Sequence, residues 1–220
     1  MPQSTSLASS LCVSCRKRTL SCFYVITSNT QGETLSLTLF FIFSDSCQLT
    51  LDPNTANQYL CLSEGNRKVT CSNEVQSYPD HPDRFTSHNQ VLCREGLSGV
   101  CYWEVEWSGG GLRVAVSYKE ISRKGYGCEC VFGRNDQSWV LFCTTSRCWF
   151  YHNNTRADIP VPCSSRVGVY LDHRAGTLSF YSVSDTMTLL HRVQTTFTQP
   201  LYPGFNVYKG TSVKILTPIQ

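Results

Sequence analysis

Residues 99–118 constrain the fold most, because apolar and polar side chains alternate there along two successive runs. A period of two is typical of strands with one buried and one polar face. The alternating apolar residues are Cys101, Trp103, Val105 and Trp107 in the first run and Leu112, Val114, Val116 and Tyr118 in the second. Residues 108–111 read Ser-Gly-Gly-Gly and tolerate positive φ, so the pattern predicts two strands joined as an antiparallel hairpin.

From residue 47 onward, short apolar runs alternate with turn residues. Asp52 followed by Pro53 is a helix-start signal, which predicts one short N-terminal helical turn over residues 54–57. No amphipathic helical window follows residue 60, so the predicted fold class is all-β, a β-sandwich. Strands are predicted over residues 48–51, 59–63, 68–72, 90–94, 138–143, 148–152, 166–172, 177–183, 188–193, 204–208 and 212–216, the pair 166–172 and 177–183 forming a second hairpin.

The predicted core lies on the inward faces of these strands. Buried aromatic side chains dominate its energetics, because each removes about 150 to 250 Å² from water. The predicted structural core is Trp103, Val105, Trp107, Val114, Val116, Trp139, Leu171 and Phe180. In the strands 138–143 and 148–152, the side chains predicted to face inward or to shield an edge are Trp139, Leu141, Trp149 and Tyr151.

Net charge and cysteine content indicate which class of partner and which cellular compartment to expect. The 220 residues carry a formal net charge of +3, and this mild basicity without clustered lysine and arginine argues against a nucleic-acid partner. The 13 cysteines are odd in number and several lie in strand-like positions, so they are interpreted as small buried hydrophobic residues. This interpretation predicts a reducing compartment and a cytoplasmic location, with a secreted, partly disulfide-bonded protein as the alternative.

Residues 1–46 differ from the rest of the chain, being rich in Ser, Thr and Leu without a steady period, and are predicted to form an irregular, disordered tail. The apolar run 35–43 is too short to cross a membrane, and no signal-peptide pattern is present. Because a pyrimidine-rich stretch before a splice acceptor would encode such a run, we hypothesise that the tail is a gene-model artefact. Mature transcripts that join these codons to the downstream exon would refute this.

No arrangement of catalytic or metal-binding residues is recognisable. Glu104 and Glu106 share a strand face as a carboxylate pair does, but a polar outer face or structural partners is the favoured interpretation. Cys12, Cys15 and Cys22 lack the histidine or second cysteine pair of a zinc site. The residues therefore predict no enzyme activity, no cofactor and no metal.

Several motifs follow one another in order between residues 47 and 216. They are Leu-Asp-Pro at 51–53, Trp-Glu-Val-Glu at 103–106, Ile-Ser-Arg-Lys-Gly at 121–125, Phe-Gly-x-Asn at 132–135, Ser-Trp at 138–139, Gly-Val-Tyr-Leu-Asp at 168–172, Gly-Thr-Leu-Ser-Phe-Tyr at 176–181 and Pro-Gly-Phe at 203–205. Together they resemble the PRY/SPRY (B30.2) domain. The resemblance is greatest to the fish domains that end tripartite-motif ubiquitin ligases, NACHT and leucine-rich-repeat receptors, and stonustoxin-like pore-forming proteins.

This resemblance implies a bent, two-layer antiparallel β-sandwich of the concanavalin-like jelly-roll type, with a PRY segment at 47–100 and an SPRY segment at 101–217 in one domain. It implies no enzyme activity here, because ligase activity in tripartite-motif proteins belongs to a RING. A protein partner is expected at the surface loops, without nucleic acid or membrane. The implied partner-binding residues are Lys119, Glu120, Phe142, Thr144, Phe205, Asn206 and Tyr208.

Two departures from the family pattern limit what the resemblance carries. Thr144 stands where an antibody-binding relative has an aromatic residue, so that relative's target is not transferred. Arg174 is the last residue of the sequence Leu-Asp-His-Arg at 171–174, at a position where the family commonly has an acidic residue. The leading expectation is a cytosolic protein-interaction module of innate immune or ubiquitin-ligase signalling. The alternative is a domain of a secreted, stonustoxin-like membrane-active protein, which disulfides and a glycan at Asn153 would favour.

Overall fold

The computed structural model describes residues 20–25, 38–43 and 47–217, which fall into two units divided after Ser46. In the first unit, β1 (Leu20–Val25) pairs with β2 (Thr38–Phe43) in antiparallel register, from Leu20 opposite Phe43 to Val25 opposite Thr38. Both segments are rich in aromatic and β-branched residues, which favour strands. This pairing differs from the irregular tail expected over residues 1–46, while Cys12 and Cys15 lie outside the described residues.

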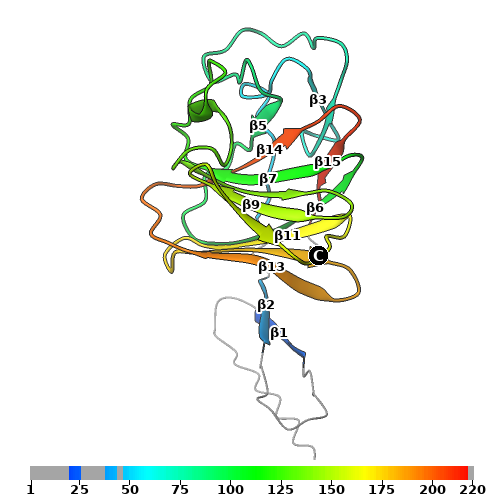
Figure 1. Ribbon diagram of the computed structural model, residues 1–220, viewed down its shortest axis with the longest axis vertical. Helices are drawn as coiled ribbons and strands as arrows, with labels where there is room; N and C mark the ends of the chain where they lie inside the picture. Colours follow the sequence, from blue (N-terminus) through cyan, green and yellow to red (C-terminus); the bar gives the residue numbers. More distant parts are fainter. Residues whose placement is uncertain (1–19, 26–37, 44–46, 218–220) are drawn as a thin grey trace, which may run out of the picture. The chain divides into compact units, whose positions relative to one another are not determined.

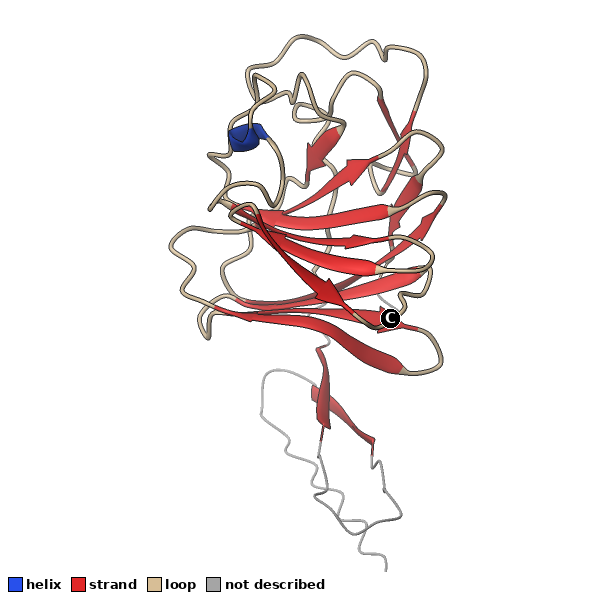
Figure 2. Ribbon diagram, in the orientation of Figure 1, coloured by secondary structure: helices blue, strands red, loops and turns tan. Residues whose placement is uncertain are grey.

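Residues 47–217 form two antiparallel sheets, as Figures 1 and 2 show, and the predicted all-β sandwich is confirmed. In spatial order, the six-stranded sheet contains β10 (Thr155–Ile159), β9 (Cys148–His152), β8 (Ser138–Cys143), β7 (Leu112–Ser117), β14 (Tyr202–Val207) and β5 (Gln90–Leu92). The seven-stranded sheet contains β13 (Met187–Gln194), β12 (Thr177–Val183), β11 (Arg166–Asp172), β6 (Val100–Ser108), β15 (Ser212–Ile215), β4 (Lys68–Cys71) and β3 (Leu60–Ser63).

The main core lies between the two sheets. Trp103 and Val105 of β6 face Val114 and Val116 of β7 across it, and all four side chains are at most 3% exposed. Every residue of the predicted core is buried, including Trp107, Trp139, Leu171 and Phe180. The predicted hairpin of β11 and β12 is also confirmed, with Val169 opposite Phe180.

The prediction that β6 and β7 form a hairpin is wrong, although both strands exist where expected. β6 pairs with β11 and β15, whereas β7 pairs with β14 and β8, so residues 109–111 carry the chain from one layer to the other. Gly109 adopts φ +102°, and a Cβ at this position would collide with the carbonyl oxygen of Gly210. Only glycine therefore suits this crossing.

The short helix predicted over residues 54–57 is also wrong. These residues form a turn, in which the Asn54 amide donates to the Asp52 carboxylate at 3.0 Å. The Thr55 hydroxyl donates to the Asp52 carbonyl at 2.9 Å and accepts from the Leu92 amide of β5 at 3.0 Å. The second bond fixes the turn to the six-stranded sheet. Among the described residues the one helix is the 3₁₀ helix η1 (Cys128–Cys130), and none is long and apolar enough to span a bilayer.

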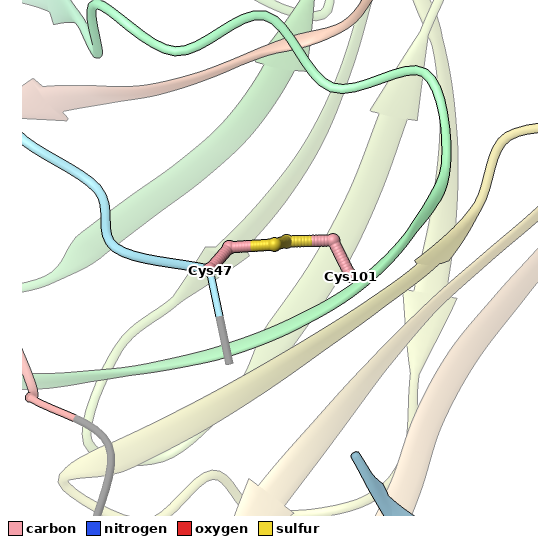
Figure 3. Close-up of a disulfide and its surroundings, with 2 residues drawn as sticks. All are labelled: Cys47 and Cys101. Atoms are coloured by element: carbon pink, nitrogen blue, oxygen red, sulfur yellow. A yellow bond between two sulfur atoms is a disulfide. The ribbon is translucent and has the colours of Figure 1, made fainter. Parts of the chain in front are cut away.

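A disulfide joins Cys47, the first residue of the second unit, to Cys101 of β6, with 5.9 Å between their Cα atoms (Figure 3). It ties the segment before β3 to β6 across 54 positions of sequence. Cys101 was expected as a free buried thiol, and it is buried but paired. The other eight cysteines of residues 47–217 are free.

The outer face of the six-stranded sheet is covered along one half. There Ile121 and Phe132, from the connection between β7 and β8, pack with Phe85 on Ala115 and Val140 of the sheet. The rings of Phe85 and Phe132 meet edge to face at 5.4 Å. The connection thus forms a second, smaller core and leaves the other half of this face without such a cover.

Candidate functional site

The uncovered half of the six-stranded sheet presents a row of large side chains. Strand register places Arg113 of β7 opposite Phe142 of β8, and Phe142 opposite Trp149 of β9. Their strand neighbours Val114, Leu141 and Phe150 point into the main core, so the alternation of a strand turns this row outward. All three side chains of the row are half-buried.

Tyr208, one residue beyond β14, completes what we call the aromatic patch: Arg113, Phe142, Trp149 and Tyr208. The Arg113 guanidinium carbon lies 4.8 Å from the Phe142 ring centroid and 5.4 Å from that of Tyr208. The rings of Phe142 and Trp149 stack at 5.1 Å with an angle of 25°. These separations are those of cation–π and offset aromatic contacts, so the patch is held in one arrangement before any partner arrives.

Arg113 has an unusual electrostatic environment. Its side chain makes no hydrogen bond or ion pair within the part of the chain that the structure describes, and its Nε is buried. Burial raises the pKa of Tyr208, which keeps the phenol neutral, and the Arg113 charge opposes this shift. The patch therefore combines a cation that lacks an acceptor with three aromatic surfaces.

Three of the sequence-predicted partner-binding residues meet here. Phe142 and Tyr208 belong to the aromatic patch, with 6.1 Å between their rings. Thr144 lies next to it at the start of the β8–β9 turn. Its hydroxyl accepts from the Arg147 amide at 3.1 Å, which closes that turn.

Lys119 and Glu120 lie elsewhere. Both are exposed and lie just beyond the end of β7 at Ser117, whereas Arg113 is the second residue of that strand. With about 3.3 Å per residue, Lys119 is roughly 20 Å along the sheet from Arg113. The Lys119 ammonium lies 6.0 Å from the ring of Tyr202, at the end of the sheet covered by the β7–β8 connection. The two places are therefore separate surfaces of the domain.

Phe205 and Asn206 are corrections to the predicted site. Phe205 lies on β14, opposite Val114 of β7, and its side chain points into the main core. It is therefore 0% exposed. Asn206 is 7% exposed and donates to the Gln90 side chain at 3.4 Å. Gln90 itself is bonded to the Cys130 carbonyl and the Phe132 amide, so the connection covers both polar side chains.

Sequence reasoning missed Arg113 and Trp149. Trp149 was predicted to face inward or to shield an edge, but its neighbour Phe150 takes the inward face opposite Leu141, and Trp149 lies on the outer face. Arg113 in an otherwise apolar strand was the available signal, since a cation at this position marks the outer face. Strand β10 was missed as well, because its sequence Thr-Arg-Ala-Asp-Ile has little alternation.

The carboxylate of Glu104 on β6 is held by one neighbour on its own strand and one on the adjacent strand, whereas Glu106 is exposed. The Tyr102 hydroxyl donates to Glu104 at 2.8 Å, and Arg166 of β11 lies 3.7 Å from the same carboxylate. Burial and the Glu104 charge raise the pKa of Tyr102 well above its ordinary value. Glu104 is thus engaged in structural contacts on the outer face of the seven-stranded sheet.

Comparison with known proteins gives matches over the second unit. Residues 49–97 match PRY, the SPRY-associated domain, and residues 100–220 match the SPRY domain. The chain is 41% identical over 167 residues to stonustoxin subunit alpha of Synanceia horrida, a match covering 74% of this chain and 24% of that protein. It is 39% identical over 163 residues to tripartite motif-containing protein 16 of Mus musculus, covering 73% and 29% respectively.

A solved TRIM65 PSpry domain is similar in structure, with a TM-score of 0.73 and 28% identity over 79% of this chain and 91% of that one. The chain spans less than a third of the length of the two curated relatives.

Proposed function

The chain belongs to the PRY/SPRY family, and from this premise we propose that it recognises a protein partner through the aromatic patch, in innate immune or ubiquitin-ligase signalling in the cytoplasm. The SPRY domain is a non-catalytic interaction module found in tripartite-motif proteins. The proposal assigns the contact to Arg113, Phe142, Trp149 and Tyr208 rather than to the Lys119 loop.

The observation that carries the proposal is a half-buried arginine side chain without an acceptor, packed on the rings of Phe142 and Tyr208, with Trp149 stacked on Phe142. Tyrosine, tryptophan and arginine are the residues that contribute most to binding free energy when a partner covers them. A rigid cluster also loses little side-chain entropy on binding.

The charges around the patch indicate the chemistry of the partner. Arg147 in the β8–β9 turn and Lys209 after Tyr208 are both exposed beside it. With Arg113 they place three cations near an apolar centre, whereas the one carboxylate opposite Trp149, that of Asp158 on β10, is paired with Arg156 at 3.4 Å. We therefore expect a partner segment that brings at least one carboxylate together with apolar side chains.

Differential capture tests this assignment. The full chain and its Arg113→Glu variant are used in parallel as baits, and captured proteins are quantified by mass spectrometry. The charge reversal should abolish capture of the true partner, while Lys119→Glu should leave it nearly unchanged. A partner that is retained by Arg113→Glu and lost with Lys119→Glu would place the binding surface at the other end of the sheet.

The second candidate function is a domain of a secreted, membrane-active protein of the stonustoxin type. The Cys47–Cys101 disulfide favours it, since disulfides persist in oxidising compartments, as does the 41% identity to stonustoxin subunit alpha. The eight free cysteines of residues 47–217 favour the cytoplasmic proposal instead.

Peptide mapping of the protein from its native tissue distinguishes the two candidates. A quantitative Cys47–Cys101 bridge with a glycan on Asn153, which is exposed in the β9–β10 turn, would favour the secreted candidate. Free thiols and unmodified Asn153 would favour the cytoplasmic one.

A further inference from the structure

Three cysteines from two separate segments meet beside the β8–β9 hairpin. Cys143 ends β8, Cys148 begins β9, and Cys163 lies in the segment between β10 and β11. Their sulfur atoms all lie within 4.8 Å of one another. We propose that these thiols form a binding site for one soft, thiophilic metal cation such as Zn²⁺ or Cu⁺, independent of the partner-binding role.

The hairpin brings the first two sulfurs together. Cys143 and Cys148 are directly opposite in register, and their sulfurs lie 2.7 Å apart. Because the Thr144 amide donates to the Arg147 carbonyl at 2.8 Å, the adjacent pair Cys143–Cys148 occupies a non-hydrogen-bonded position, where side chains approach most closely.

The third sulfur is what favours a metal over a simple disulfide. A disulfide uses two thiols, whereas Cys163 approaches both members of the hairpin pair. Metal–sulfur bonds of about 2.3 Å in trigonal or tetrahedral geometry require sulfurs about 3.8 to 4.0 Å apart. Small χ1 rotations bring the cluster to that spacing, and the three sulfurs then satisfy a trigonal cation or leave one position of a tetrahedral one open.

A cavity of about 360 Å³ lies beside the hairpin. Cys148 lines it, together with Arg147, Trp149, Asp158, Ile159 and Pro160. Its volume is sufficient for water molecules or a hydrated ion next to Cys148. Cys163 itself is only half-buried, whereas Cys143 and Cys148 are buried.

Binding of a cation releases protons. Each cysteine loses its thiol proton to solvent as its sulfur–metal bond forms, so the affinity of the site should rise with pH.

Thiol protection in the full wild-type chain tests the site without any substitution. The chain is fully reduced, freed of metal and alkylated with or without one equivalent of Cd²⁺. Trypsin cuts after Arg134, Arg147, Arg156 and Arg166, so the three thiols fall on three different peptides. We expect Cd²⁺ to slow alkylation of Cys143, Cys148 and Cys163 about tenfold or more, and to leave the free cysteines Cys61 and Cys128 unchanged.

Variants supply the second measurement. Cys163→Ser should weaken Cd²⁺ binding, followed by its thiolate charge-transfer absorption, about tenfold or more, while the exposed Cys128→Ser should not. Repeating the titration with Zn²⁺ and Cu⁺ in competition with chromophoric chelators identifies the preferred ion. Equal protection of all free cysteines, undiminished binding in Cys163→Ser, or a Cys143–Cys148 disulfide that survives reduction would each overturn the proposal.

Discussion

The Arg113 guanidinium lies over the ring of Phe142, 4.8 Å from its centroid, and has no hydrogen bond or ion pair within the described part of the chain. Two neighbouring strands of one sheet supply these residues, so the contact is set by strand register rather than by loop conformation. A cation held in this way is available to a carboxylate of a partner at little further cost in entropy.

Matched tryptophan substitutions test the assignment of faces. Trp103→Ala should lower the free energy of unfolding by about 3 to 5 kcal/mol, because its side chain is only 3% exposed in the main core. Trp149→Ala, from the half-buried outer row, should cost about 1 kcal/mol. Urea unfolding monitored by circular dichroism measures both. Equal costs would contradict the inward and outward assignments.

The crossing between the sheets is tested by adjacent glycines. Gly109→Ala should lower the free energy of unfolding by about 1 to 3 kcal/mol, because φ is +102° and the added Cβ would collide with the Gly210 carbonyl oxygen. Gly110→Ala has open space around its Cβ and should be neutral or slightly stabilising. Thermal melts of the two variants give the comparison, and a Gly109→Ala melt at the wild-type temperature would refute the crossing geometry.

Phe205→Ala tests the corrected position of that residue. Its fully buried ring predicts a loss of about 3 to 5 kcal/mol of stability, with less folded protein. The exposed Lys119→Ala should change stability by about 0.5 kcal/mol or less. If Phe205→Ala instead melted like the wild type while losing a partner, the residue would be a surface anchor after all.

Strand positions and the core could be predicted from the sequence because alternation reports which face of a strand is buried. Alternation does not report which strand is the hydrogen-bonded neighbour, and for this reason β6 and β7 were predicted as a hairpin although they face each other across the core. The aromatic patch shows the same limit. Phe142 and Tyr208 were predicted as partner-binding residues. Arg113 lies beside Phe142 because of the pairing register of β7 and β8, and Trp149 faces the same side because of which alternate residues of β9 point outward.

Histidine burial predicts how stability depends on pH. Burial lowers the pKa of His191, whose ring stacks on Phe150 at 4.2 Å, and that of His88. Such a group binds fewer protons when folded, so its contribution is present above the unfolded pKa of about 6.5 and is lost as pH falls below it.

The melting temperature should therefore fall between about pH 7.5 and 5.5, and His191→Gln should reduce that fall. An identical pH profile for this variant would show that His191 does not contribute.

The most direct test uses the partner that differential capture identifies. Calorimetry measures the affinity of this purified partner for two tyrosine variants of the chain. Tyr208 of the aromatic patch and Tyr59, next to the seven-stranded sheet, are 36% and 37% exposed, so the substitutions to alanine are matched. The account predicts that Tyr208→Ala weakens binding about tenfold or more and Tyr59→Ala leaves it unchanged. Unchanged affinity for Tyr208→Ala, with a loss for Tyr59→Ala, would contradict it.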